Sequence, residues 1–160
     1  MTTASAAATG LPRARSADPV RAGQRVRNLF SGETMTFLRT SSETMGELIE
    51  LELGLRPLGA PGGAPHRHVV TERFAITGGV AAVWIGGQRP RIARAGDVVE
   101  VPAGRWHFVV SLTRVRALVT IKPGMRFDEL LAAWAQVGSG DLRPQTLRRV
   151  VPLLREHGCL

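Results

Sequence analysis

Short segments with a strand-like alternation, separated by glycine- and proline-rich turns, most limit what this chain can fold into. In the segment 47–55, aliphatic residues at every second position alternate with Glu50 and Glu52. A period of two is typical of a strand with one buried face. Many short strands of this kind, evenly spaced between turns, predict a β-sandwich or a β-barrel.

The rest of the chain continues this pattern and then changes to a helical one. Apolar residues recur at helical spacing in 127–137, and again in 147–154, where Pro152 makes the middle of the second helix doubtful. We therefore expect one or two C-terminal helices packed outside the barrel. Further strands are expected at 33–39, 69–76, 80–85, 91–93, from Gly96 onward, 108–112 and 115–121.

Composition divides the 160 residues into three parts and excludes some partners. Residues 1–22 lack an apolar period and are expected to be a disordered leader, followed by a barrel domain over 23–125 and a helical extension over 126–160. The net charge of +8 invites a nucleic-acid interpretation, but the arginines are scattered and tyrosine is absent, so we do not expect nucleic-acid binding.

Location and membrane association follow from equally simple features. The single cysteine, Cys159, cannot form an internal disulfide, which fits a reducing cytoplasm. Neither a long apolar run nor a secretory signal is evident, so we expect a cytoplasmic protein without a membrane partner.

Three of the four histidines fall in two short blocks that carry the chemistry of this sequence. The first block holds His66, His68 and, four residues further on, Glu72, while His107 ends the second. Residues two apart on a strand face the same way, so the first three side chains share one face. Nothing local brings His107 to them, and the meeting requires a closed antiparallel barrel. Imidazole and carboxylate donors together suit Zn, Fe, Mn, Co, Ni or Cu(II).

The two blocks resemble the two motifs of the cupin superfamily, over about residues 30–125. The first motif departs from the family pattern at its leading glycine, which is Ala60 here, and the second departs at its final asparagine, which is Ser111. The matching positions are His66, His68, Glu72 and Gly79 in the first motif and Gly96, Pro102, Gly104 and His107 in the second.

This resemblance implies both a fold and a ligand set. The expected fold is all-β, a double-stranded β-helix or jelly-roll barrel, with the helical extension outside. The implied ligands of one divalent transition metal (Fe, Mn, Ni, Zn, Co or Cu) are His66, His68, Glu72 and His107, and they would lie inside the barrel. Strand parity then suggests a mainly apolar pocket around them, with Phe37, Phe74, Ile76, Val109 and Ser111 as candidate lining residues.

The chain is similar in its site to quercetinase-like cupin dioxygenases and related tailoring enzymes of secondary metabolism. The resemblance implies an oxygenase or related reaction on a small apolar or aromatic molecule, with Glu72 as a ligand that can also take a proton. One alternative is a non-catalytic cupin that binds or senses a small molecule. Another is a metal-dependent isomerase, hydrolase or cyclase on the same site. Cupins commonly pair, so a homodimer is also expected.

Overall fold

Two antiparallel sheets form the body of the molecule. The structure, a computed structural model, describes residues 19–160, so most of the expected 1–22 leader lies outside the described residues. The larger sheet has the strand order β1-β2-β3-β9-β4-β7 and the smaller one the order β6-β5-β8. Non-consecutive neighbours such as β3 and β9 are typical of a rolled-up jelly-roll barrel.

Most of the strands lie close to where the alternation places them. The bounds are β1 Arg25–Asn28, β2 Glu33–Arg39, β3 Ile49–Leu55, β4 Thr71–Gly78, β5 Val80–Ile85, β6 Arg91–Arg94, β7 Val98–Val101, β8 His107–Ser111 and β9 Val115–Lys122. The strand β1 was not expected, because four residues are too few to show a period. Val20, inside the expected leader, is buried in the core, so packing begins before β1.

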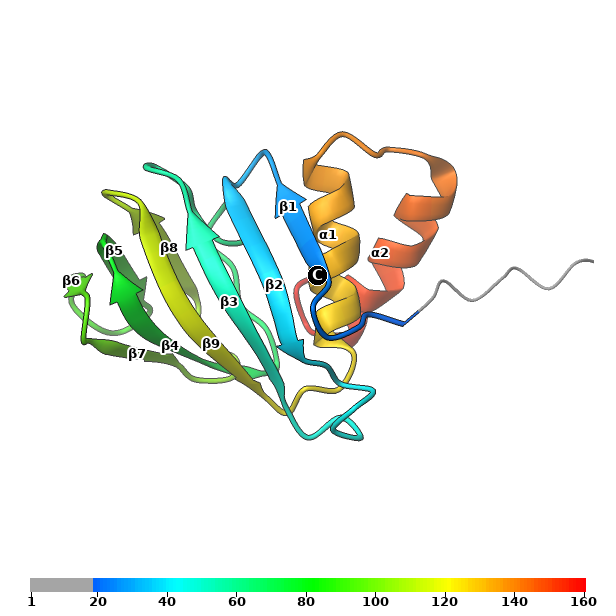
Figure 1. Cartoon of the computed structure of the whole chain (residues 1–160), viewed down its shortest axis with the longest axis horizontal. Helices are drawn as coiled ribbons and strands as arrows, with labels where there is room; N and C mark the ends of the chain where they lie inside the picture. The colour runs from blue at the N-terminus through cyan, green and yellow to red at the C-terminus, as the bar shows by residue number, and fades with distance from the viewer. Residues whose placement is uncertain (1–18) are drawn as a thin grey trace, which may run out of the picture.

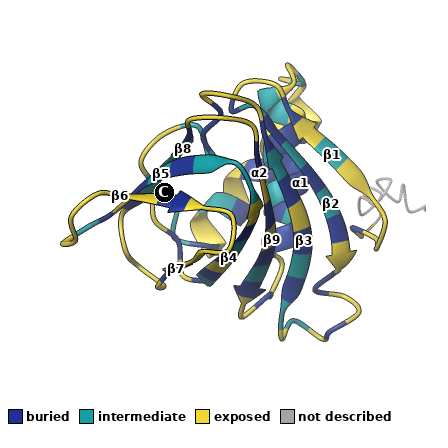
Figure 2. Cartoon of the chain, turned by 60° about the vertical axis from the view of Figure 1, so that its left-hand side comes forward, coloured by how far each residue is buried: buried dark blue, intermediate teal, exposed yellow. Residues whose placement is uncertain are grey.

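Alternation along the strands decides which side chains form the core. The register pairs Leu51 of β3 with Phe37 of β2 and Val119 of β9, which places these apolar residues in one inward-facing row. Figure 2 shows the buried positions of β2, β3 and β9 as dark bands between exposed or half-buried ones. The inner faces of the two sheets meet, since residues of both line a small internal cavity of about 10 Å³.

Two helices follow the last strand, α1 at Phe127–Gly138 and α2 at Pro144–Glu156. They pack on one another beside β1, at the opposite end of the molecule from β5 and β6 (Figure 1). The Ser139 hydroxyl donates to the Arg27 carbonyl, and this bond ties the end of α1 to β1. Pro152 lies within α2 on its exposed side, so the helix tolerates the residue that made it doubtful. No helix among residues 19–160 is long and apolar enough to cross a membrane.

Candidate metal centre

The three histidines of the two blocks come together because their backbones pair. His66 and His107 form an isolated antiparallel bridge, in which each backbone N–H donates to the carbonyl of the other residue, at 3.0 and 2.9 Å. His107 is the first residue of β8, and His66 stands at the end of the loop that leads toward β4. The barrel thus supplies the long-range contact that the sequence alone could not establish.

A backbone carbonyl holds each of the three imidazole rings. The Nδ1 atoms of His66, His68 and His107 lie 2.8, 2.8 and 3.0 Å from the carbonyl oxygens of Ala64, Val70 and Arg105. A carbonyl only accepts, so each Nδ1 carries a proton, and in the neutral form of the ring Nε2 is the atom with the free lone pair. In metal-binding histidines, such a hydrogen bond from the nitrogen that does not bind the metal orients the ring and sets its tautomer.

Glu72 completes the group from the second position of β4. Its Oε2 lies 3.2 Å from His68 Nε2 and 3.9 Å from His107 Nε2. Neighbouring ligands of an ion with bonds of about 2.1 Å stand about 3 Å apart, which agrees with the shorter of these distances. His68 Nε2 makes no hydrogen bond, although it is buried.

Burial and mutual attraction shift the protonation of this group. Burial raises the pKa of Glu72, but the neighbouring imidazoles, His68 above all, outweigh it, and the net shift is downward. Burial lowers the pKa of His68, yet the Glu72 carboxylate outweighs it, and the net shift is upward. For His107, burial dominates and lowers the pKa. Glu72 is therefore ionised and His107 neutral at neutral pH, as a cation site requires.

These observations fit a transition-metal ion. One nitrogen from each of His66, His68 and His107 lies within 4.8 Å of the others, and Glu72 adds an anionic oxygen. Three nitrogens and one carboxylate leave coordination positions free on a six-coordinate ion, in contrast to a closed structural zinc site.

A cavity of about 280 Å³ opens beside His66, His68 and Glu72. Its walls are mainly apolar, with Phe74 of β4 close to the ligands, and include neither an arginine nor a lysine. The other apolar wall residues on the strands are Met35, Leu51, Leu53, Val119 and Ile121.

The C-terminal extension forms the rest of this cavity wall. Phe127, the first residue of α1, packs edge-to-face on the His68 ring with centroids 5.2 Å apart. Leu130, Leu131, Trp134, Leu154, Cys159 and Leu160 also line the cavity. The helices lie outside the barrel, as expected, but they also help to enclose its binding space, which periodicity alone did not indicate.

The five candidate lining residues occupy different places. Phe74 lines the cavity with the histidines. Ile76 and Val109 line the separate 10 Å³ cavity, and Phe37 is fully buried in the core. The Ser111 hydroxyl lies within hydrogen-bond distance of two backbone carbonyls, those of Arg56 and Gly59, and can donate to either, so it holds that loop in place. Parity gave the correct inward face for these residues but not their depth in the barrel.

Sequence reasoning missed one candidate site residue, Glu33. It is 5% exposed at the start of β2 and lines the same cavity as Glu72. Burial raises its pKa to about 7, although the Ser31 hydroxyl and the Gly62 N–H donate to its carboxyl group. The signal was available, because Glu33 shares the strand parity of the inward residues Met35 and Phe37.

Gly62 brings the loop before His66 close to the metal centre. Its φ is +71°, a conformation that only glycine adopts readily. A Cβ atom at this position would lie 2.5 Å from the His66 ring. The glycine at position 62 therefore allows the backbone of this loop to lie close to the His66 ring, in addition to forming a turn.

Comparison with known proteins supports the same interpretation. A family model described as a cupin domain matches residues 56–121, a range that contains all four proposed ligands. Curated protein sequences give no match. The fold and the matched motifs support membership of the cupin superfamily.

Several solved structures share the fold at low sequence identity. An RmlC-like cupin from Shewanella frigidimarina matches with a TM-score of 0.54 and 20% identity, over 68% of this chain and 92% of its own. A predicted oxalate decarboxylase from Thermotoga maritima matches with a TM-score of 0.53 and 21% identity, over 64% and 96%. KdgF from Halomonas sp. matches with a TM-score of 0.52 and 19% identity, over 61% of this chain and 84% of its own.

Proposed function

We propose that this cupin is a metal-dependent enzyme that acts on a small apolar or aromatic molecule, by an oxygenase or related tailoring reaction. The observation that carries the proposal is the convergence of three Nε2 atoms and one ionised carboxylate beside a mainly apolar cavity. A divalent transition ion held by His66, His68, Glu72 and His107 would supply Lewis-acid or redox chemistry there.

The cavity supports a substrate of modest size. Its volume of about 280 Å³ is at the low end for small-molecule sites. Single-ring phenols therefore fit better than larger ring systems such as flavonols. A small dicarboxylate, suggested by the predicted oxalate decarboxylase among the similar structures, fits less well, because the walls carry two carboxyl groups and neither an arginine nor a lysine.

Glu33 and Glu72 support a division of roles between two carboxyl groups. Their surroundings move the pKa values in opposite directions, upward for Glu33 and downward for Glu72. Such a pair is typical of sites where one carboxyl exchanges a proton and the other stays ionised. In this proposal Glu72 is a ligand, and Glu33 donates a proton to, or takes one from, the molecule in the cavity. This arrangement equally supports the isomerase, hydrolase or cyclase variant.

One observation favours a second candidate, a ligand-binding or sensor protein. The C-terminal residues Leu154, Cys159 and Leu160 form part of the cavity wall, so a bound molecule would contact α2 and the tail directly. A ligand could then change the position of these segments and so change an outer surface.

A two-stage experiment tests the proposed activity. Oxygen uptake and product formation are measured for the metal-loaded protein with single-ring catechols and phenols, and with flavonols for comparison. His66→Ala should abolish turnover. The control Arg67→Ala should retain turnover, because Arg67 is exposed and its guanidinium carbon lies 5.6 Å from the centre of the Trp106 ring. Binding of phenols without turnover would favour the sensor, and neither binding nor turnover would contradict both.

A further inference from the structure

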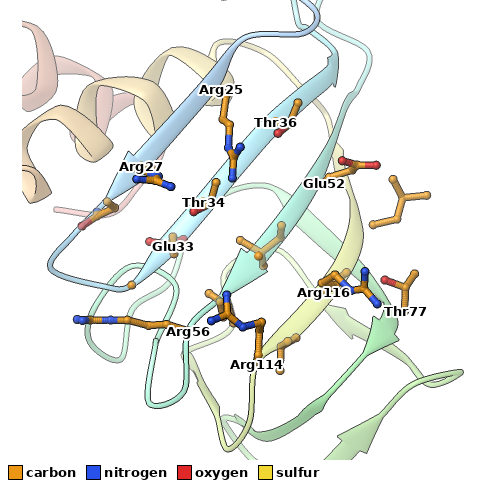
Figure 3. A pocket seen from close by; sticks show the side chains of 18 of the residues that line it. Arg25, Arg27, Glu33, Thr34, Thr36, Glu52, Arg56, Thr77, Arg114 and Arg116 are labelled. Carbon is orange, nitrogen blue, oxygen red and sulfur yellow. The ribbon is translucent and has the colours of Figure 1, made fainter.

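The outer face of the larger sheet carries a groove with a strong positive charge. It has a volume of about 900 Å³ and runs over β1, β2, β3 and β9 (Figure 3). Five arginines line it, and we call it the arginine groove: Arg25, Arg27, Arg56, Arg114 and Arg116. All five are exposed, and the one exposed carboxylate among the lining residues is that of Glu52.

These arginines are not held by ion pairs. Among residues 19–160 the arginines that pair with carboxylates are Arg39, Arg126 and Arg143, none of which lines the groove. Arg56 donates one hydrogen bond, to the Leu29 carbonyl, and the other four make no side-chain hydrogen bond in this region. Their guanidinium groups therefore keep donors available, and like charges at this density repel one another unless an anion lies between them.

The strand register explains how a groove forms between the arginines. A single cross-strand row runs from Arg27 through Thr34 and Gly54 to Arg116. Three strand spacings separate the two arginines, about 14 Å between backbones. Gly54 has no side chain and Thr34 a short one, so the floor is low while long side chains stand on both sides (Figure 3). Thr36 adds a second hydroxyl in the neighbouring row.

We propose that the arginine groove is a binding site for a ligand that carries several phosphate groups. Guanidinium groups bind phosphate through paired, charge-assisted hydrogen bonds, and the threonine hydroxyls can donate additional ones. A phosphate group carries a charge of about −1.5 to −2, so two or three of them match the excess of positive charge. This site lies on the outer face of the larger sheet, and none of its five arginines lines the cavity beside the histidines.

Other occupants fit the groove less well. A second copy related by a two-fold axis would place five arginines against five. Single-stranded nucleic acid is bound by aromatic side chains that stack on bases, and none lines the groove.

Calorimetric titration with inorganic tripolyphosphate tests this proposal on the full-length protein. The wild type should bind at low salt, and the double variant Arg27→Gln/Arg116→Gln should bind about tenfold more weakly or worse. The control Arg89→Gln/Arg148→Gln loses the same charge at exposed positions outside the groove, and should retain the wild-type affinity within about twofold. His66→Ala should bind tripolyphosphate normally.

Several results would overturn the proposal. The wild type could fail to bind tripolyphosphate at low salt, or the control variant could lose as much affinity as the groove variant. An oligonucleotide that bound more tightly than tripolyphosphate at the same salt concentration would also contradict it. Amide chemical shifts of Thr34 and Gly54 in the wild type give a second reading that needs no variant. These shifts should move on addition of tripolyphosphate, and unchanged shifts would contradict the site.

Discussion

The cavity with the histidines and the arginine groove lie on opposite faces of the same strands, and they differ in almost every physical respect. Met35, Leu51 and Val119 line the cavity, while their neighbours Thr34, Glu52 and Leu118 line the groove. The inner face is apolar around a few converging donors, and the outer face is open and cationic. One alternating sequence thus builds two surfaces, because successive side chains of a strand point to opposite sides.

The largest expected effect comes from placing a charge on either side of β9. Val119→Glu buries an unpaired carboxylate in a position that is 2% exposed, whereas Leu118→Glu places one at a position that is 39% exposed. We expect Val119→Glu to lose about 4 kcal/mol or more of unfolding free energy, and Leu118→Glu to change it by about 0.5 kcal/mol at most. Urea denaturation measures both, and similar losses would show that the two faces are not distinct.

Glu33 should make the stability of the metal-free protein depend on pH. Its pKa is raised from 4.5 to about 7 by burial, so folding favours the protonated form. This contribution is full below about pH 4.5 and declines as the pH rises to about 7. The unfolding free energy of Glu33→Gln minus that of the wild type should therefore rise by about 3 kcal/mol across this window.

Glu43→Gln is the matched control for that measurement. Glu43 is exposed and its pKa is lowered from 4.5 by the hydroxyl and the backbone N–H of Thr40, so its stabilising contribution is lost only as the pH falls below about 4.5 and changes little between pH 4.5 and 7. A difference for Glu33→Gln that stays constant between pH 4.5 and 7 would show that Glu33 does not resist ionisation in the folded protein.

Gly62→Ala should weaken metal binding without unfolding the protein. The new Cβ would meet the His66 ring at 2.5 Å and move it from its place beside His107. Displaced supporting groups of metal ligands typically cost about 10- to 100-fold in affinity. Gly140→Ala is the control, since its φ is also positive, at +94°, but its Cβ would contact nothing within 4 Å. Equal metal affinities in a competition titration would contradict this role of Gly62.

The smallest expected effect concerns the arginine groove. Arg27→Gln alone should change the unfolding free energy by about 0.5 kcal/mol at most, because Arg27 is exposed and has no described carboxylate partner. Thermal and urea denaturation would measure this. A loss well above that limit would mean that Arg27 stabilises the sheet, and that its role is not confined to binding.

Much of the barrel could be predicted from the sequence, because one-sided burial leaves a period of two. Segments such as 80–85 agree with the structure at both ends, whereas β1 was missed, since its four residues are paired by tertiary contact with β2. The proposed ligand set followed from the resemblance of the motifs, but the meeting of His66 and His107 depends on a bridge across 41 residues.

The surroundings of the site were harder to predict. Phe127 reaches the His68 ring only because α1 docks beside β1, a matter of three-dimensional packing that helical periodicity does not contain. The arginines appeared scattered along the sequence, and cross-strand register brings Arg27 and Arg116 into one row. Arginines that are far apart in the sequence therefore lie together on the outer face of the larger sheet.

Metal content of the purified protein tests the central claim most directly. After expression with a trace-metal mixture, the wild type should carry about one divalent transition ion per chain, by the single-site argument above. His107→Ala should lose this ion while circular dichroism shows an intact β-sheet structure. If the folded wild type bound no such ion under competition-free titration, or if His107→Ala bound it equally well, the proposed coordination by His66, His68, Glu72 and His107 would be wrong.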